Sequence, residues 1–269
     1  MREVLAVIKE QFSSAGIIFR MSRYEDKATY QSHYLGLAWQ ILNPAIQVGI
    51  YYLVFGLGMN QGRKMNGFEF IVWMLVGIIQ WFYINSSVMG ASNSIYRQVG
   101  MVAKMKFPVS ALPTINIVSN LSSYLPMVVI VILTMLNFGH MPTVFWLQGF
   151  YYFFCMFVFL FAFGVLNSTI TVLVRDYHIA LQSIMRLLFY VSGPIWDLDG
   201  RGLPVMLVRI LKFNPFYYII EGFRDSFLYQ RGFWEKPEYT IVFWSLTLLV
   251  LVIGCHLHMK FRARFVDFI

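Results

Sequence analysis

Long apolar runs that contain almost no charge constrain this chain more than any other feature. A run of 18 or more apolar residues is long enough to cross about 30 Å of hydrocarbon as a helix. We place six such spans at residues 35–59, 69–91, 109–137, 147–174, 179–196 and 239–259. Only 13% of the residues are charged, against about 25% in a soluble domain. The sequence therefore predicts an all-α polytopic membrane protein with six transmembrane helices.

The positive charges collect in alternate connections between these spans. Twelve lysines and arginines lie in the N-terminal stretch, in residues 92–108, after the fourth span and in the C-terminal tail. The first loop on the opposite side has only Arg63 and Lys64. The positive-inside rule then predicts that both termini are cytoplasmic. We assign the net charge of +8 to topology and membrane-lipid contact, and expect no nucleic acid as a partner.

The first 33 residues are too polar to cross a membrane. Val4, Val7, Ile8 and Phe12 recur at helical spacing, which favours an amphipathic helix on the membrane surface. Arg20, Arg23 and Lys27 follow at intervals that place them on one helix face. We therefore expect residues 1–33 to form cytoplasmic interface helices.

The segment between the fifth and sixth spans mixes aromatic rings with charge. Gly193-Pro194 should end the fifth span, and Asn214 followed by Pro215 should begin a new helix. This helix has an apolar stripe, and Glu221 and Arg224 can pair at i, i+3. The pieces are too short to cross a membrane, which leaves two possibilities. They form either a re-entrant helical hairpin over about 203–229 or an interfacial loop with two amphipathic helices.

Motifs for catalysis, metal binding or nucleotide binding do not occur. No glycine is followed by lysine, so the chain has no P-loop for ATP phosphates. Asp197 and Asp199 suggest turn chemistry more than a metal-dependent sugar transferase. Charge inside the spans is almost confined to Arg186, which argues against a proton-driven transporter. We expect no catalytic residues, no metal and no cofactor in this chain, with the energy source in another subunit.

Polar and aromatic side chains nevertheless enter the spans. They either form interhelical hydrogen bonds and ordinary packing or line a path for sugars. Residues 92–108 form a basic amphipathic connection, which is either an ordinary loop or a helix for a groove of a partner protein. The polar residues of the first and third spans are Gln40, Asn43, Gln47, Asn116, Ser119, Asn120, Ser122 and Ser123.

Four stretches together resemble the type-2 ABC exporter permeases for polysaccharides. They are YLGLAWQILNPAIQVGIYYLVFG (34–56), GMVAKMKFP (100–108), VLVRDYHIALQSIMRLLFYVSGPIW (172–196) and LKFNPFYYIIEGFRDSFLY (211–229). The last stretch, extended to Glu235, is most similar to the wall teichoic-acid export permeases. The resemblance implies a homodimer in a bacterial plasma membrane, bound to two copies of a separate ABC ATPase subunit that holds ATP and Mg. Residues 34–269 would form the ABC-2 type transmembrane domain.

The resemblance also suggests roles for particular residues. The stretch at about 95–107 would be the coupling helix on the ATPase, through Ile95, Tyr96, Arg97, Val102, Lys104 and Lys106. The cytoplasmic entrance, where the substrate diphosphate would bind, comprises Arg20, Arg23, Lys27, Tyr34, Leu35 and Gly36. Anchoring to anionic lipid is the alternative role of the three cations. The channel and outer gate comprise Asn43, Gln47, Tyr51, Trp81, Phe216, Tyr217, Tyr218, Glu221 and Arg224.

The expected function is therefore export of a lipid-linked polymer. The resemblance implies teichoic acid on undecaprenyl diphosphate, moved from the inner to the outer leaflet as ATP is hydrolysed in the partner subunit. The same machine could carry O-antigen, capsular polysaccharide or a drug-type lipophile. A membrane enzyme of sugar–lipid synthesis, which would need Asp197 and Asp199, and a channel without an ATPase remain as distant alternatives.

Overall fold

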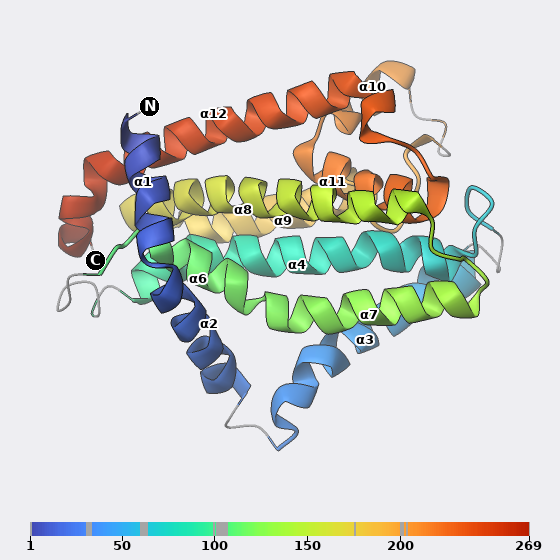
Figure 1. The fold of residues 1–269 in the computed structure, drawn as a ribbon, viewed down its shortest axis with the longest axis horizontal. Coiled ribbons are helices and arrows are strands. Elements are labelled where there is room, and N and C mark those ends of the chain that lie inside the picture. Colours follow the sequence, from blue (N-terminus) through green and yellow to red (C-terminus); the bar gives the residue numbers. More distant parts are fainter. Residues whose placement is uncertain are drawn as a thin grey trace.

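The structure is a computed structural model that describes residues 2–30, 34–59, 64–98, 100, 107–174, 176–199, 202 and 204–268. Among these residues it is built from helices and has no strand. The longer helices run along one axis of the molecule (Figure 1). The α-helices are α1 (Arg2–Ser13), α2 (Ala15–Tyr30), α3 (Trp39–Tyr51), α4 (Phe70–Arg97), α6 (Ala111–Ser119), α7 (Leu121–Asn137), α8 (Gln148–Leu173), α9 (Tyr177–Val191), α10 (Val205–Lys212), α11 (Pro215–Arg224) and α12 (Pro237–Phe261).

Short 3-10 and π-helical segments extend or connect these helices. They are η1 (Gly36–Ala38), η2 (Tyr52–Met59), η3 (Val144–Leu147), η5 (Asp225–Tyr229), η6 (Phe233–Glu235) and η7 (Arg262–Phe268).

Within the described residues, five helical stretches are long and apolar enough to cross a membrane. They are Trp39–Gly58, Phe70–Arg97, Ala111–Asn137, Val144–Leu173 and Pro237–Phe265. The predicted fifth span at 179–196 corresponds to α9, which has only 15 residues. At 1.5 Å per residue α9 is about 22 Å long, short of about 30 Å of hydrocarbon. Gly193 adopts a positive φ of 68° and precedes Pro194, which ends α9 before the predicted residue 196. Five of the six predicted spans are therefore long enough to cross a membrane alone, and the fifth predicted span, α9, is a helix that is shorter than predicted.

The connections fall at two ends of the bundle. Both termini lie at one end, where α4 ends, α6 begins and α8 turns into α9 (Figure 1). The opposite end carries the turn before α4, the connection from α7 to α8, and the α10–α11 region (Figure 1). We refer to the two ends as the terminal end and the hairpin end. The assignment of the terminal end to the cytoplasm stays a prediction.

The core lies around α4, which packs against α6, α7, α8, α9 and α11. In the most apolar window of α4, 78% of residues are buried, against 6% for the span that contains α3. The outward apolar face of α3 has no cover within the described chain, because α3 makes only limited contact with α4 and α7. An exposed apolar surface of this kind faces lipid or another subunit.

The predicted N-terminal helices are present at the terminal end. Val7 is buried on α8 and α12 with Ala162, Leu251 and Cys255. Gln11 accepts a hydrogen bond from the Thr114 hydroxyl at 2.8 Å, which ties α1 to α6. Phe12, expected on the apolar face, is exposed. The helix α1 therefore buries part of its apolar stripe on the bundle and leaves Phe12 uncovered by the described chain.

The predicted helical pair between α9 and α12 also forms. The Asn214 side chain accepts a hydrogen bond from the Phe216 backbone N–H at 3.0 Å, and Pro215 occupies the first helical position. These two residues start α11 as the sequence indicated. The apolar face of α11 is buried against α4 and α8, whereas most of α10 is exposed. A helix held this deeply in the bundle is unlike the alternative of a loose interfacial loop.

A charged cluster joins two connections at the hairpin end. The Glu69 carboxylate lies 2.9 Å from His140 Nε2 and 3.3 Å from Lys64 Nζ. The hydrogen bond with His140, assisted by nearby Lys64, lowers the pKa of Glu69 from 4.5 to about 2. Glu69 therefore stabilises the fold while it is ionised.

We expect Glu69→Gln to lower the thermal unfolding temperature slightly at pH 7. The Glu69 side chain is 28% exposed, so solvent screening limits the effect to about 1 kcal/mol. A depressed carboxyl pKa stabilises the fold above pH 4.5, and this contribution is lost as the pH falls toward 2. Melting curves in detergent should show the two proteins converging over that window. A difference in unfolding temperature between wild type and Glu69→Gln that stays constant with pH would contradict a stabilising role of ionised Glu69.

Candidate functional site

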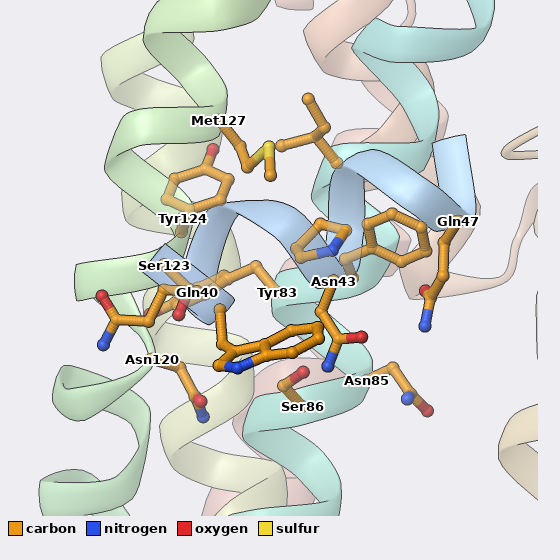
Figure 2. A pocket seen from close by; sticks show the side chains of 14 residues that line it. Gln40, Asn43, Gln47, Tyr83, Asn85, Ser86, Asn120, Ser123, Tyr124 and Met127 are labelled. Atoms are coloured by element: carbon orange, nitrogen blue, oxygen red, sulfur yellow. The ribbon is translucent and has the colours of Figure 1, made fainter. Parts of the chain in front are cut away.

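A polar groove opens between α3, α4 and α7. Its volume is about 240 Å³, and its side chains converge on one space from the three helices (Figure 2). The polar members are uncharged amides and hydroxyls, mixed with aromatic rings. The lining consists of Trp39, Gln40, Asn43, Pro44, Gln47, Ile79, Phe82, Tyr83, Asn85, Ser86, Asn120, Ser123, Tyr124 and Met127.

Helical spacing explains how each element contributes to the groove. Gln40, Asn43 and Gln47 lie at i, i+3 and i+7 on α3 and so share one face. Adjacent residues Asn85 and Ser86 contribute from α4, and Ser123 from α7. The face of α3 that turns toward the bundle is therefore polar, while the rest of α3 is apolar and exposed.

Hydrogen bonds hold the groove walls in place. Gln40 Nε2 donates to the Ser122 hydroxyl at 3.2 Å, which joins α3 to α7. The Tyr124 hydroxyl donates to Gln80 Oε1 at 2.6 Å behind the groove. Asn43, Gln47 and Asn85 line the opening, so amide donors and acceptors face the space. This supply of neutral hydrogen-bonding groups suits a hydroxyl-rich ligand.

A second lobe of about 260 Å³ continues the groove toward α9. Gln47, Phe82 and Asn85 line both lobes, which makes the two spaces neighbours. Aromatic rings dominate here: Tyr51 and Phe189 have centroids 5.7 Å apart, as Trp81 and Phe189 do at 5.6 Å. The remaining lining residues of this lobe are Met185, Arg186 and Tyr190.

The structure brings together four of the residues expected in the channel and separates the others. Asn43, Gln47, Tyr51 and Trp81 line the two lobes. Phe216 is buried behind Trp81, edge to face at 6.0 Å, and packs on Phe159 in the core. Its position supports the groove wall and does not form its surface.

The α11 residues Tyr217, Tyr218 and Glu221 line a different, smaller cavity of about 60 Å³. Asp225 and Lys236 also border it, 3.0 Å apart. Burial raises the pKa of Asp225 to about 6, although Lys236 opposes the shift. A space this small holds a few waters and not a sugar ring. These residues are therefore separate from the polar groove in the described structure.

Arg224 is buried inside the bundle, with 1% of its side chain exposed. Its guanidinium donates to the carbonyls of Gly193 and Pro194 at 2.9 and 2.8 Å, and to Glu221 at 3.3 Å. It also stacks over the Trp73 ring, 3.4 Å from the centroid. A side chain enclosed in this way does not face the groove, where the channel and outer gate were expected. Arg224 instead connects α11 to α4 and to the end of α9.

The residues expected at the entrance lie at the end of α2 and the start of α3. Arg20 and Arg23 are exposed on one side of α2, and Tyr34 and Leu35 are exposed before Gly36. Gly36 adopts a positive φ of 49°, which favours glycine at this turn. The side chain of Lys27 lies outside the described part of the chain. Arg20 Nε donates to the Gly16 carbonyl at 3.2 Å within α2, and the diphosphate assignment stays a prediction.

The expected coupling residues divide into three groups. Ile95 is fully buried against Ile18 and Leu112, so its side chain has no surface for a partner protein. Tyr96 and Arg97 are exposed, but they form the last turn of α4 and not a separate helix. The remaining three, Val102, Lys104 and Lys106, lie outside the described residues.

The two aspartates considered for a metal-dependent enzyme form structural contacts instead. Asp197 accepts from the backbone N–H of Asp199 at 3.1 Å and from Asn66 at 3.1 Å. Asp199 pairs with Lys212 at 2.7 Å. The described residues contain no group of three or more His, Cys, Asp or Glu able to hold a metal ion. Turn formation and ion pairing account for both carboxylates, as the turn interpretation predicted.

The polar contribution of α4 to the groove was not predicted from the sequence. Asn85, Ser86 and Ser87 form a polar run within α4, and Asn85 and Ser86 face the space. This short polar run was the available signal. Arg186 was noted as an unusual charge but was not assigned a role.

Comparisons with known proteins relate this chain to one family of transporters. A family model described as ABC-2 type transporter matches residues 18–228. The O-antigen export system permease protein RfbA of Myxococcus xanthus is 23% identical over 246 residues, covering 91% of this chain and 93% of that protein. An RfbA of Klebsiella pneumoniae is 23% identical over 242 residues, covering 90% of each.

Proposed function

This chain belongs to the ABC-2 type transporter family as the permease subunit of an exporter, and we propose that it moves a lipid-linked polysaccharide across the membrane. The observation that carries this proposal is the polar groove of neutral amides, hydroxyls and aromatic rings among the spans. Amides exchange hydrogen bonds with sugar hydroxyls, and ring faces pack on sugar C–H surfaces. Such a lining suits a carbohydrate better than an apolar drug.

The cargo we favour is a polysaccharide of the O-antigen type. Both relatives carry the name of O-antigen export permeases. The teichoic-acid expectation from the sequence has no comparable support, so the alternative stated beside it becomes the main proposal.

The partners we propose are a second copy of this chain and two copies of an ATPase subunit. The groove is open along α3 and α9, whose outward apolar faces have no cover in the described chain. A second copy facing these helices would complete a passage from two grooves. Nucleotide-dependent differences in affinity between the ATPase states would drive its opening. The end of α4, which carries Tyr96 and Arg97, lies at the terminal end (Figure 1) and would be near the contact with the ATPase subunits.

The test is purification of the tagged full-length chain from its native membrane, followed by identification of bound subunits. We expect a stoichiometric ATPase subunit whose ATP hydrolysis increases with an O-antigen-type glycan on polyprenyl diphosphate. Greater stimulation by a teichoic-acid precursor would restore the first interpretation. A chain that purifies without any ATPase, and without ATP hydrolysis, would contradict the proposal.

A further inference from the structure

Arg186 is a cation exposed in the aromatic lobe of the groove. It lies nine residues after the start of α9, about 14 Å along the helix. Its neighbours in the lobe are the amides of Gln47 and Asn85 and the rings of Tyr51 and Tyr190. Within the described part of the chain, no carboxylate lies within ion-pair distance of its guanidinium.

An unpaired arginine among membrane helices is costly and calls for an explanation. A charged side chain at membrane depth costs at least about 2.5–3.5 kcal/mol unless water or an opposite charge compensates it. Other buried or partly buried cations at this protein's hairpin end have such partners: Arg224 has Glu221, and Lys236 has Asp225. Arg186 differs because its environment offers only neutral groups. The charge of Arg186 must then be compensated by water in the groove or by an anion from outside the described chain.

The lobe is suited to an anion with oxygen acceptors. A guanidinium presents forked N–H donors that match phosphate and carboxylate oxygens two at a time. The nearby amides can donate further hydrogen bonds, and the surrounding rings lower the local dielectric, which strengthens the attraction. Binding of a neutral sugar would not require the charge.

We propose that Arg186 binds oxyanion groups of the transported molecule as they pass through the groove. This inference rests on the proposed export function and specifies the chemistry of its substrate. The oxyanion has two possible sources: the diphosphate that links the polymer to its lipid carrier, or phosphate or carboxylate groups within the polymer. In both cases Arg186 is a residue that selects anionic cargo.

The experiment uses the complete transporter, reconstituted with its ATPase subunit in vesicles. Three probes are titrated: the polyprenyl diphosphate carrier alone, the carrier with a neutral glycan, and the carrier with a glycan that contains phosphodiesters. The variants are Arg186→Gln, which removes the charge, and Arg186→Lys, which keeps it. Arg209→Gln is the matched control, because Arg209 is 67% exposed on α10 and outside the groove.

We expect Arg186→Gln to raise the half-stimulating concentration of the relevant probe by roughly tenfold or more, the loss of a charge-assisted contact. Arg186→Lys should raise this half-stimulating concentration by a smaller factor, and Arg209→Gln should leave it at the wild-type value. If Arg186→Gln raises the half-stimulating concentration of all three probes, the oxyanion is the carrier diphosphate. If it raises that of the phosphodiester glycan alone, the oxyanion belongs to the polymer.

Three results would overturn the inference. If the wild type responds to the probes and Arg186→Gln responds equally, Arg186 has no role in binding, although the proposed function stands. If Arg186→Gln leaves stimulation unchanged but dissociates the two permease copies, the arginine pairs across the subunit interface. If the wild type responds to no probe, the proposed function and the inference fail together.

Discussion

Arg224→Ala will destabilise this protein by about 3–5 kcal/mol, because the substitution leaves a partly buried carboxylate and two carbonyls without their buried donor. Glu221 would lose its ion pair, and the carbonyls of Gly193 and Pro194 would lose hydrogen bonds of 2.9 and 2.8 Å. The stacking on Trp73 would also be lost. In a chain of this size the unfolding temperature should fall by roughly 6–15 °C.

Thermal unfolding of the purified protein in detergent measures this effect. Arg209→Ala is the control, because that side chain is exposed and its nearest carboxylate is 3.9 Å away. We expect a change of less than about 0.5 kcal/mol there. Gly77→Ala disturbs the same contacts from α4, because an added Cβ would lie 2.3 Å from the Arg224 guanidinium and would displace it. Wild-type unfolding temperatures for both Arg224→Ala and Gly77→Ala would show that this junction does not hold the fold.

Ser86→Trp will reduce polysaccharide transport by at least about tenfold, a barrier increase of about 1.4 kcal/mol or more. Ser86 is exposed on α4 within a groove of about 240 Å³, where an indole would occupy much of the passage (Figure 2). The side chain is outside the buried core, so the fold should tolerate the change.

Transport is measured as the amount of lipid-linked glycan that becomes accessible at the outer face of reconstituted vesicles. The control is Leu248→Trp, which adds an indole to an exposed apolar position on α12, away from the groove. Ser86→Trp with wild-type transport and normal assembly would place the path elsewhere. Loss of transport in both variants would indicate a general effect of added tryptophan.

The predictable part of the fold came from local patterns. Uninterrupted apolar runs identified five spans, because a membrane requires the backbone polar groups to be satisfied within each helix. Asn214 and Pro215 located the start of α11, because capping depends on neighbouring residues alone. The predicted fifth span was too long because apolar composition continued past the point where Gly193 ends the helix.

The candidate site was predictable only in part. Asn43 and Gln47 were identifiable because polar residues are unusual on a membrane helix. Their convergence with Asn85 and Ser86 depends on how α3 lies against α4, which no local pattern specifies. Arg224 illustrates the opposite case, since it was expected in the channel and outer gate, whereas its carbonyl partners lie about 30 residues earlier in the chain and hold it inside the bundle.

By itself, the sequence determined that this chain is a helical membrane protein without nucleotide-binding or catalytic motifs, because hydropathy, helix signals and motif spacing are local properties. Only the tertiary structure decided which polar residues face a common groove and which charges are neutralised inside the bundle. Arg186 and Arg224 are both arginines near apolar helices, yet one is exposed in the groove and the other is enclosed by carbonyls. That difference depends on helix packing, which brings together residues far apart in the chain.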